Sequence, residues 1–389
     1  MRILWASPLP PVRSGVADYA VELLPELARL SDVRVLADPE GPGPEPGSTI
    51  CGCPVVEGSI TPDPGEIQLL HLGNNPYHRW LLDRLHLPRT VVVLHDAVLH
   101  HLLVEATLAQ GDDRRFEGLL LEAHPEAEAL VRARAAAVTG PRDAFLFPAR
   151  RAFLQGLSGI VVHSRWAERE VTRDLPELPV AMVGLSAADP GPVDRARLRQ
   201  RLSISPEELL VMHLGFLTPQ KGVHDLLGAI AAVRRQKVPA RLLIVGEGEH
   251  AESLDSIVHD LGLEDSVGFT GWVAPENFSP LPAAADLGVV LRSPSAGETS
   301  AAVLRFLACG TPVAVTALHQ FLELPEAAAP RVTPGPSATA ELARIIFRAH
   351  SDRKGWEGRR TAARQVYLKD HTPEMAAGQL VAALAKMVR

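Results

Sequence analysis

The chain is short of the features that mark membrane, secreted and nucleic-acid-binding proteins. No apolar run approaches the roughly 18 to 20 residues of a membrane-spanning helix. The start, MRILWASPLPPVRSG, is apolar for only a few residues before prolines and polar groups intervene, which disfavours a signal peptide. No long block of like charge occurs, and the net charge is −7. Nucleic-acid binding uses a basic face, so such a partner is disfavoured.

Cysteine is scarce, and the motifs of several enzyme classes are missing. Only Cys51, Cys53 and Cys309 occur. A C-x-C pair without a second pair of ligands is a weak metal signal, so buried thiols and a reducing cytoplasm are the simpler interpretation. The sequence has no G-x-S-x-G elbow, Walker turn or H-E-x-x-H motif. The sequence therefore lacks the motifs by which these hydrolases and NTPases are identified, which disfavours both functions.

Short apolar runs of strand length alternate with amphipathic stretches along the whole chain. The runs lie at 2–7, 33–37, 67–73, 90–96, 159–164 and 180–185, and again at 209–215, 240–248, 266–271, 287–293 and 311–315. Helical spacing of apolar residues predicts helices at 17–30, 222–236, 250–262, 300–309 and 337–350. The Pro- and Gly-rich stretches 38–48 and 186–194 are predicted to be a surface loop and a linker.

This alternation predicts an α/β fold with one parallel sheet in each half of the chain. Strands that are apolar on both faces and joined by helices form parallel sheets covered on both sides. A length of 389 residues also favours two domains. Ligands of such sheets bind beyond the carboxyl ends of the strands, so the turns that follow the strands are the places to search.

One of these turns, HLGFLTPQKGVHDLL, places Lys221 and Gly222 at the start of a helix. Free backbone N–H groups and an ammonium there form an anion site, for which phosphate is the usual occupant. The alternative is a solvated lysine at a helix start. Gly15 in SPLPPVRSGVADYA marks a second glycine turn before a helix, and IVGEGEH contains a third.

Two other turns carry single polar side chains that suit a ligand. His95 follows an apolar run, where it can orient a substrate hydroxyl or act as an acid or base. The segment HDAVLHH also offers His95, Asp96, His100 and His101 as metal ligands, but this spacing matches no established signature. Glu298 in PSAGETS precedes a predicted helix, where it either complements the helix dipole or contacts a ligand.

The ordered set G-x-L-x-x-x-K-G, I-V-G-x-G, F-T-G-W-V, A-A-A-D-L, G-E-T-S and A-C-G-T-P-V resembles the retaining glycosyltransferases of family 4. The resemblance is dense over 205–317 and thinner around Gly15, 72–78, 93–96 and 162–166. It implies a GT-B architecture, with two Rossmann-like parallel-sheet domains facing across a cleft and a C-terminal helix crossing back to the first. The implied domains are 1–186 together with 372–389, which would bind the acceptor, and 187–371, which would bind the donor.

The resemblance also assigns roles to individual residues. Lys221 would grip the donor diphosphate, Glu298 would hold the sugar hydroxyls and His95 would touch the transferring sugar; these three form the catalytic set. The implied donor-binding residues are Gly15, Gly215, Phe216, Lys221, Trp272, Val273, Glu298, Thr299, Ser300, Ala301 and Arg305. The implied acceptor-binding residues are Asn74, Asn75 and Asp96. No metal or other cofactor is implied.

The sequence departs from the family pattern at two places. Gly297 and Arg305 stand where the family has two glutamates, and Phe216 stands where it has an arginine. We hypothesise that Arg305 replaces the lost cation, since residues seven apart on a helix share a face and Arg305 would then lie behind Glu298.

The sequence therefore predicts a cytoplasmic hexosyltransferase that uses a nucleotide-diphosphate sugar and retains the anomeric configuration. A carbohydrate, a glycosylated molecule or a lipid-linked molecule would be the acceptor, and peripheral membrane contact is compatible with this. A sugar-nucleotide-binding protein with weakened catalysis and an epimerase of the same fold remain alternatives. The base and the sugar of the donor stay open.

Overall fold

The computed structural model describes residues 1–135 and 143–388, and the chain divides into two compact units. Unit 1 contains Met1–Ser186, Ala296–Thr299 and the stretch from Pro373 onward, and unit 2 contains Ala187–Ser295 and Ser300–Thr372. The short segment Ala296–Thr299 thus groups with unit 1, although the sequence suggests nothing of the kind.

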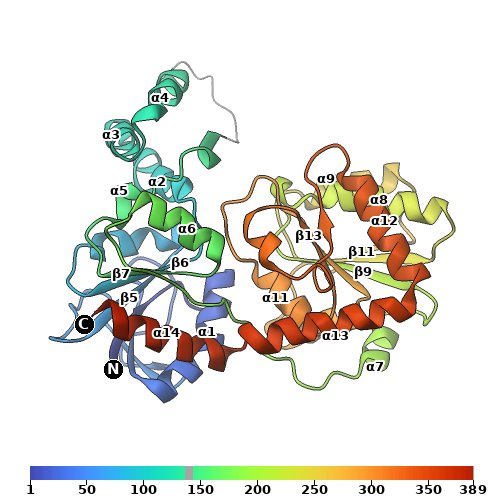
Figure 1. The fold of residues 1–389 in the computed structure, drawn as a ribbon, viewed down its shortest axis with the longest axis horizontal. Helices are drawn as coiled ribbons and strands as arrows, with labels where there is room; N and C mark the ends of the chain where they lie inside the picture. The colour runs from blue at the N-terminus through green and yellow to red at the C-terminus, as the bar shows by residue number, and fades with distance from the viewer. Residues whose placement is uncertain (136–142, 389) are drawn as a thin grey trace. The chain divides into compact units, whose positions relative to one another are not determined.

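Unit 1 is built on an eight-stranded sheet (Figure 1). Its strands, in spatial order, are β3 (Thr49–Ile50), β4 (Cys53–Val56), β2 (Asp32–Leu36), β1 (Arg2–Ala6), β5 (Ile67–Leu72), β6 (Thr90–Leu94), β7 (Gly159–Val162) and β8 (Val180–Met182). All neighbours are parallel except β3 and β4. The order reverses between β1 and β5, and this reversal is the point at which doubly wound sheets bind ligands.

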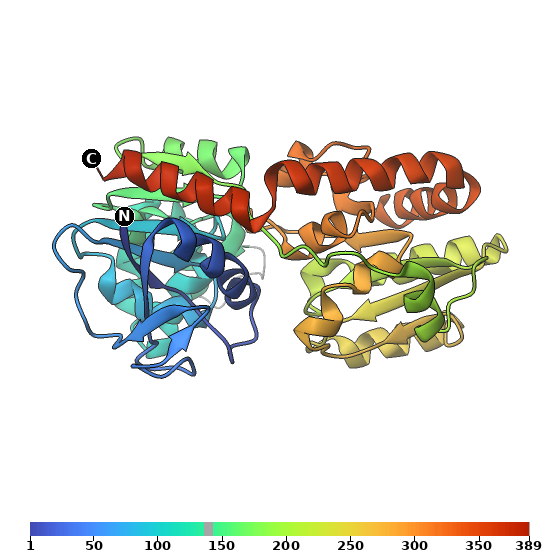
Figure 2. The same ribbon diagram turned by 90° about the horizontal axis from the view of Figure 1, so that it is seen from below.

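Two helices distant in sequence, α1 (Gly15–Leu30) and α14 (Pro373–Met387), lie side by side in unit 1 (Figures 1 and 2). Ser14 begins α1 by accepting a hydrogen bond from the Ala17 N–H at 3.1 Å. The apolar residues Leu23, Leu24 and Leu27 follow at helical spacing and are fully buried. The helix from Pro373 onward therefore returns to the first domain, as the sequence predicts.

The connection from β6 to β7 contains several short helices. They are α2 (His100–Ala106), α3 (Asp113–Ala123), α4 (Glu128–Ala135) and α5 (Arg151–Leu154). A small apolar cluster of their own, which includes Leu103, Phe116 and Leu120, holds them together. After β7, helix α6 (Arg165–Asp174) begins at Ser164, whose side chain accepts from the Ala167 N–H.

Unit 2 is built on a six-stranded sheet that is parallel throughout. In spatial order its strands are β11 (Val267–Phe269), β10 (Ala240–Val245), β9 (Leu209–Leu214), β12 (Leu287–Val290), β13 (Val313–Thr316) and β14 (Arg331–Val332). Its helices are α7 (Arg195–Arg201), α8 (Val223–Arg235), α9 (Ala251–Asp260), α10 (Pro275–Phe278), α11 (Ala301–Ala308), α12 (Ala338–Ser351) and α13 (Arg353–Asp370). Every residue of β9 is buried, and the order reverses between β9 and β12.

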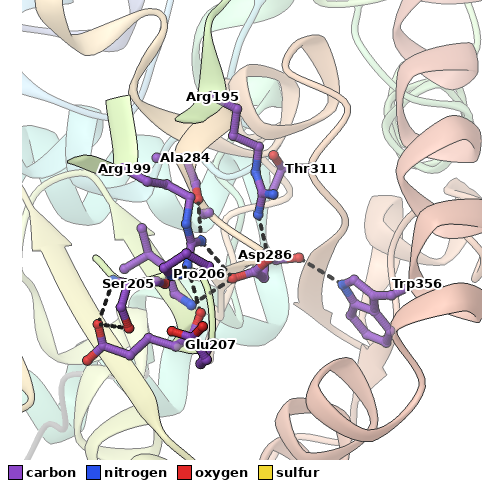
Figure 3. Close-up of polar contacts among 12 residues, drawn as sticks. Arg195, Arg199, Ser205, Pro206, Glu207, Ala284, Asp286, Thr311 and Trp356 are labelled. Carbon is purple, nitrogen blue, oxygen red and sulfur yellow. Dashed lines mark hydrogen bonds and ion pairs between the residues drawn. The ribbon is translucent and has the colours of Figure 1, made fainter. Parts of the chain in front are cut away.

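Asp286 anchors the amino end of β12 to three other elements (Figure 3). Its carboxylate accepts hydrogen bonds from Arg195 at 2.5 Å, Arg199 at 3.0 Å and the Leu210 N–H at 2.8 Å. Its carbonyl oxygen accepts from Nε1 of Trp356 at 2.8 Å. The aspartate of the A-A-A-D-L motif thus joins α7, β9 and α13, and it lies at the strand end opposite to the one where ligands of such sheets bind.

Candidate functional site

The loops that follow β9 and β12 meet at the point of unit 2 where the strand order reverses. The Ser293 N–H donates to the carbonyl oxygen of Gln220 at 2.9 Å. A Cβ added to Gly222 would lie 3.2 Å from the Cβ of Leu291, so the two backbones approach closely there. Lys221 lies between Gln220 and Gly222, and Arg292 lies between Leu291 and Ser293, so neighbouring loops present the two cations.

The glycine turns of the sequence motifs pack on one another beside Lys221. Gly215 has a φ of +117°, and a Cβ on it would stand 2.8 Å from the Lys221 ammonium nitrogen. Gly246 has a φ of +141°, and a Cβ there would stand 2.8 Å from the carbonyl carbon of Gly215. Only glycine fits such close backbone packing. The glycines thus leave room for Lys221 to lie along the end of β9.

His213 is fully buried in β9, near the side chains of Lys221 and Arg292. Its Nδ1 donates to the carbonyl oxygen of Val289 at 3.0 Å. Burial, followed by the positive charges of Lys221 and Arg292, lowers the pKa of His213 to about 3. The ring is therefore neutral at pH 7, and it feels the positive charge of both side chains. Sequence reasoning missed Arg292; the one available signal was a basic residue directly after an apolar strand.

Arg292 is half-buried, and its backbone is fixed in place. Its N–H donates to the Thr316 hydroxyl at 2.8 Å, which ties the end of β12 to the end of β13. This bond and the Ser293–Gln220 bond hold the Arg292 backbone on both sides.

The N-terminus of α11 begins a few residues after Arg292. Ser300 is its N-cap, but the Ser300 side chain makes no capping bond. Its hydroxyl is buried and has no hydrogen-bond partner among the described residues. The backbone N–H groups of a first helical turn have no partner within the helix, so they bind anions readily. Ala301 is the first residue of this turn, and its contact with the donor stays a prediction.

Two aromatic side chains stand exposed on the turns after β9 and β11. Phe216 and Trp272 each expose 46% of their surface. The turn that carries Trp272 is joined to the glycine turn after β10, because the Gly246 N–H donates to the carbonyl oxygen of Gly271 at 3.0 Å. Val273, next in the chain, is half-buried. These side chains offer apolar area beside the glycine turns, which suits a nucleobase.

The segment Ala296–Thr299, which contains Glu298, packs within unit 1. The Val98 N–H donates to the carbonyl oxygen of Ala296 at 3.0 Å. The Thr299 hydroxyl donates to the backbone carbonyl oxygen of His163 at 3.4 Å. Gly297 has a φ of +75°. The structure therefore places Glu298 and Thr299 in the same unit as His95, whereas Ser300 and Ala301 belong to unit 2.

Arg305 does not share a helix face with Glu298, and the expected alignment of these two residues is wrong. The helix α11 begins at Ala301, so Glu298 lies outside it and the seven-residue spacing has no helical meaning. Arg305 is 8% exposed, and its guanidinium carbon lies 5.3 Å from the ring centroid of Phe278. Its role in donor binding stays a prediction; the loop next to that of Lys221 carries a different cation, Arg292.

His95 follows β6 in unit 1 and lies among aromatic side chains. Its Nε2 is 3.0 Å from Nδ1 of His71. The rings of His163 and Tyr19 lie 4.9 and 5.2 Å from its own, measured between centroids. Burial, followed by the neighbouring His163, His71 and His78, holds the pKa of His95 well below its usual range. His95 is therefore a neutral imidazole at pH 7, suited to hydrogen bonding with sugar hydroxyls.

The three predicted acceptor-binding side chains make hydrogen bonds to the protein. Asp96 accepts from the Asn74 N–H at 2.7 Å, and Asn74 Oδ1 accepts from the Leu102 N–H at 3.0 Å. Asn75 caps the following turn by accepting from the Tyr77 N–H. These bonds shape the loop after β5, which gives Asn74 and Asn75 a structural reason to be present.

Gly15 is the first residue of α1, and a Cβ added there would meet nothing within 4 Å, so the glycine leaves open space at the helix start.

The alternative metal site of the HDAVLHH segment is not formed. Within the described part of the chain, no three His, Cys, Asp or Glu residues are grouped to hold a metal ion. Among the described helices, none has both the length and the apolar character needed to cross a membrane.

Residues 208–352 match the family described as Glycosyl transferases group 1. The chain is also similar to a GDP-mannose-dependent alpha-(1-6)-phosphatidylinositol monomannoside mannosyltransferase of Mycobacterium tuberculosis, with 40% identity over 98 residues, a quarter (25%) of each protein. The matched region thus spans only a small part of that relative's length.

Two solved structures resemble the chain over nearly its whole length. Sucrose-phosphate synthase from Thermosynechococcus elongatus has a TM-score of 0.71 and 19% identity, with 100% of this chain and 99% of that chain covered. HepE of Anabaena, solved in complex with UDP, has a TM-score of 0.63 and 18% identity, with 99% and 100% covered. The chain therefore has the predicted GT-B fold, and its residues 208–352 are similar to the glycosyl transferases group 1 domain.

Proposed function

We propose that the protein is a glycosyltransferase that moves a hexose from a nucleotide-diphosphate sugar to an acceptor with retention of the anomeric configuration. The observation that carries this proposal is the pair of cations, Lys221 and Arg292, on adjoining loops of unit 2. A departing nucleoside diphosphate gains negative charge, which fixed cations and helix N–H groups stabilise. The match of residues 208–352 to the glycosyltransferase domain supports the same reaction.

Each part of the site has a role in this reaction. Lys221, Arg292 and the first turn of α11 bind the diphosphate, while Phe216 and Trp272 contact the base. Glu298 holds hydroxyls of the sugar, and His95 forms a hydrogen bond to it. Charge on the leaving group is then balanced by protein groups, so we expect turnover to survive chelation of divalent metal ions.

The acceptor is a carbohydrate, a glycosylated molecule or a lipid-linked molecule. The similarity to a phosphatidylinositol monomannoside mannosyltransferase supports a glycosylated lipid, and the acceptor screen should begin with such molecules. The same relative supports a GDP-linked sugar, whereas the fold is shared with a protein solved with UDP, so both bases belong in the donor screen.

A thermal-shift screen against UDP-, GDP-, ADP- and dTDP-sugars identifies the donor. A ligand present at a hundredfold its dissociation constant adds about 2.7 kcal/mol to the stability of the folded state. Release of nucleoside diphosphate in the presence of acceptor then establishes transfer, and NMR of the product reports its anomeric configuration.

Other outcomes separate the alternatives. Binding without release of nucleoside diphosphate would identify a sugar-nucleotide-binding protein, and interconversion of sugars without release would identify an epimerase. An inverted product would contradict retention. Loss of turnover with a chelator, restored by added metal, would contradict a metal-independent reaction.

A further inference from the structure

His71 is the penultimate residue of β5 and lies in direct contact with His95. It has no exposed surface, and its Nδ1 is 3.0 Å from Nε2 of His95. The two rings are stacked with a centroid distance of 5.3 Å. On its other side the ring of Trp5 lies 3.9 Å from that of His71 between centroids. None of the sequence motifs singled out His71.

A single hydrogen bond joins His71 and His95, and the ring that donates it can be assigned. Both rings are neutral, because burial lowers the pKa of each well below its usual range. The other nitrogen of His71, Nε2, is buried and has no hydrogen-bond partner among the described residues. The Trp5 N–H is not available to it, since that group donates to the Ser7 hydroxyl at 2.7 Å.

Two arrangements of the protons satisfy the contact. If His95 donated from Nε2, His71 would carry its own proton on Nε2, where a buried N–H would lack an acceptor. If His71 donates from Nδ1, only a lone pair is left without a partner at Nε2. Orphaned buried N–H groups are the rarer of the two in proteins. The second arrangement is therefore favoured, and it leaves the His95 proton on Nδ1.

We propose that His71 is a positioning residue that fixes the tautomer of His95, so that His95 presents a hydrogen-bond donor at Nδ1. No hydrogen bond to this Nδ1 is formed within the described part of the chain, and His95 is half-buried, so the N–H has access to a ligand. An imidazole locked in this way donates to an oxygen lone pair and cannot accept a hydroxyl proton. That the oxygen belongs to the transferred sugar rests on the proposed function; the tautomer does not.

NMR of the protein labelled with ¹⁵N-histidine tests the tautomer directly, because protonated and bare ring nitrogens have well-separated chemical shifts. A His95→Asn variant assigns the signals of this ring. In the wild-type protein we expect His95 to carry its proton on Nδ1. A proton on Nε2 would overturn the proposal whatever the protein catalyses.

Variants of His71 test its control over His95. His71→Asn keeps an N–H near the position of Nδ1 and should preserve the tautomer, whereas His71→Leu removes the donor and should shift the His95 proton toward Nε2. His163→Asn is the matched control. It removes another buried ring, 4.9 Å from His95 between centroids, and should leave the tautomer unchanged. An Nδ1 proton retained in His71→Leu would overturn the proposal.

Kinetics with the identified donor add a second readout. His71→Leu should lower kcat by up to about a hundredfold, the scale of a misplaced contact, with the donor KM nearly unchanged. His71→Asn should recover most of the loss. If the wild-type protein transfers no sugar at all, the proposed function fails while the NMR result still decides the role of His71.

Discussion

Gly297 lies against the indole ring of Trp166. A Cβ added at residue 297 would stand 2.8 Å from Cη2 of this ring and 2.9 Å from the Cβ of Ala97. The φ of +75° is a second restriction, because it lies in the left-handed region that favours glycine. A glutamate, which the family resemblance leads one to expect at this position, would not fit here, so the glycine has a physical cause in the packing of the loop that carries Glu298.

Gly297→Ala should lower the melting temperature by combining two penalties. The left-handed backbone costs about 1–2 kcal/mol for a residue with a Cβ, and overpacking against Trp166 adds about 1–3 kcal/mol. Gly262→Ala is the matched control, since Gly262 has a similar φ of +64° but open space around it. In a Trp166→Ala background the extra cost of Gly297→Ala over Gly262→Ala should shrink, and the part that remains reflects the Cβ of Ala97 at 2.9 Å. Equal costs in the wild-type background would contradict the close packing.

Lys221→Ala and Arg292→Ala should each weaken nucleoside diphosphate binding by about 1.5–3 kcal/mol, the range for a hydrogen bond to a charged group. Isothermal titration calorimetry measures this loss. The affinity of the wild-type protein should also fall as the salt concentration rises. Lys354→Ala, which removes an exposed lysine on α13 of the same unit, should bind like the wild-type protein. Unchanged affinity in either variant would remove that residue from the site.

Phe216 and Arg292 should be energetically coupled. We predict that Arg292 is the cation that takes the place of an arginine at residue 216. In that case adding Phe216→Arg to Arg292→Ala should recover part of the lost affinity, because an arginine at either position acts on the same diphosphate. Arg305→Ala should instead lower the melting temperature, since it empties a buried position beside Phe278. The same calorimetric titrations decide the outcome. Additive effects for the first pair, with a large loss of affinity in Arg305→Ala, would return the compensating role to Arg305.

Glu298→Gln should impair sugar transfer far more than it impairs binding of the bare nucleoside diphosphate. The carboxylate accepts hydrogen bonds from sugar hydroxyls, and the bare nucleotide has no sugar beyond its ribose. Turnover and calorimetry are measured on the same preparation. Glu298→Asp is the companion variant, because it keeps the charge but shortens the side chain. Parallel losses of turnover and of bare-nucleotide affinity would contradict a contact with the sugar.

Acidification should destabilise the protein through its buried histidines. Burial lowers the pKa of His78 from 6.5 to about 4, although the bond from its Nδ1 to the His71 carbonyl opposes the shift. The folded state therefore binds fewer protons than the unfolded state between these values. Its stability falls as the pH drops from about 6.5 to 4, with a contribution of about 3 kcal/mol from this residue.

Melting temperatures of a His78→Asn variant across this pH range test that contribution. Asn keeps the N–H donor toward the His71 carbonyl but does not titrate, so the fall in stability between pH 7 and pH 4 should be smaller than in the wild-type protein. His86→Asn replaces an exposed histidine and serves as the control. Identical pH profiles for the wild-type protein and His78→Asn would show that His78 does not titrate in this range.

The sequence predicts the two parallel sheets well because their central strands are continuous apolar runs. It misses β3, β4 and β14, which are only 2, 4 and 2 residues long and too short to show a period. It also misses α7, whose sequence RARLRQR contains one large apolar residue, Leu198, and so has no apolar stripe.

The parts of the site that escape prediction depend on contacts between residues distant in sequence. Glycine spacing locates the turn of Lys221, but the place of Arg292 depends on the pairing of β9 with β12, which no local pattern encodes. The grouping of Glu298 with unit 1 depends on contacts such as that between Thr299 and His163, which are 136 residues apart. The role of His71 depends on the register of β5 and β6, which places its ring beside that of His95.

The return of α14 to unit 1 has a consequence for the nascent chain on the ribosome. Residues 1–186 are synthesised first, but the face of α1 that packs on α14 stays uncovered until residues 373–387 have emerged. At typical translation rates the intervening stretch, 187–372, takes roughly 10 to 40 s to make. Throughout that interval the side of α1 that packs on α14 stays uncovered, whereas unit 2 has all of its own strands and helices as soon as residue 372 has emerged. The half that is translated first is therefore the half that is completed last.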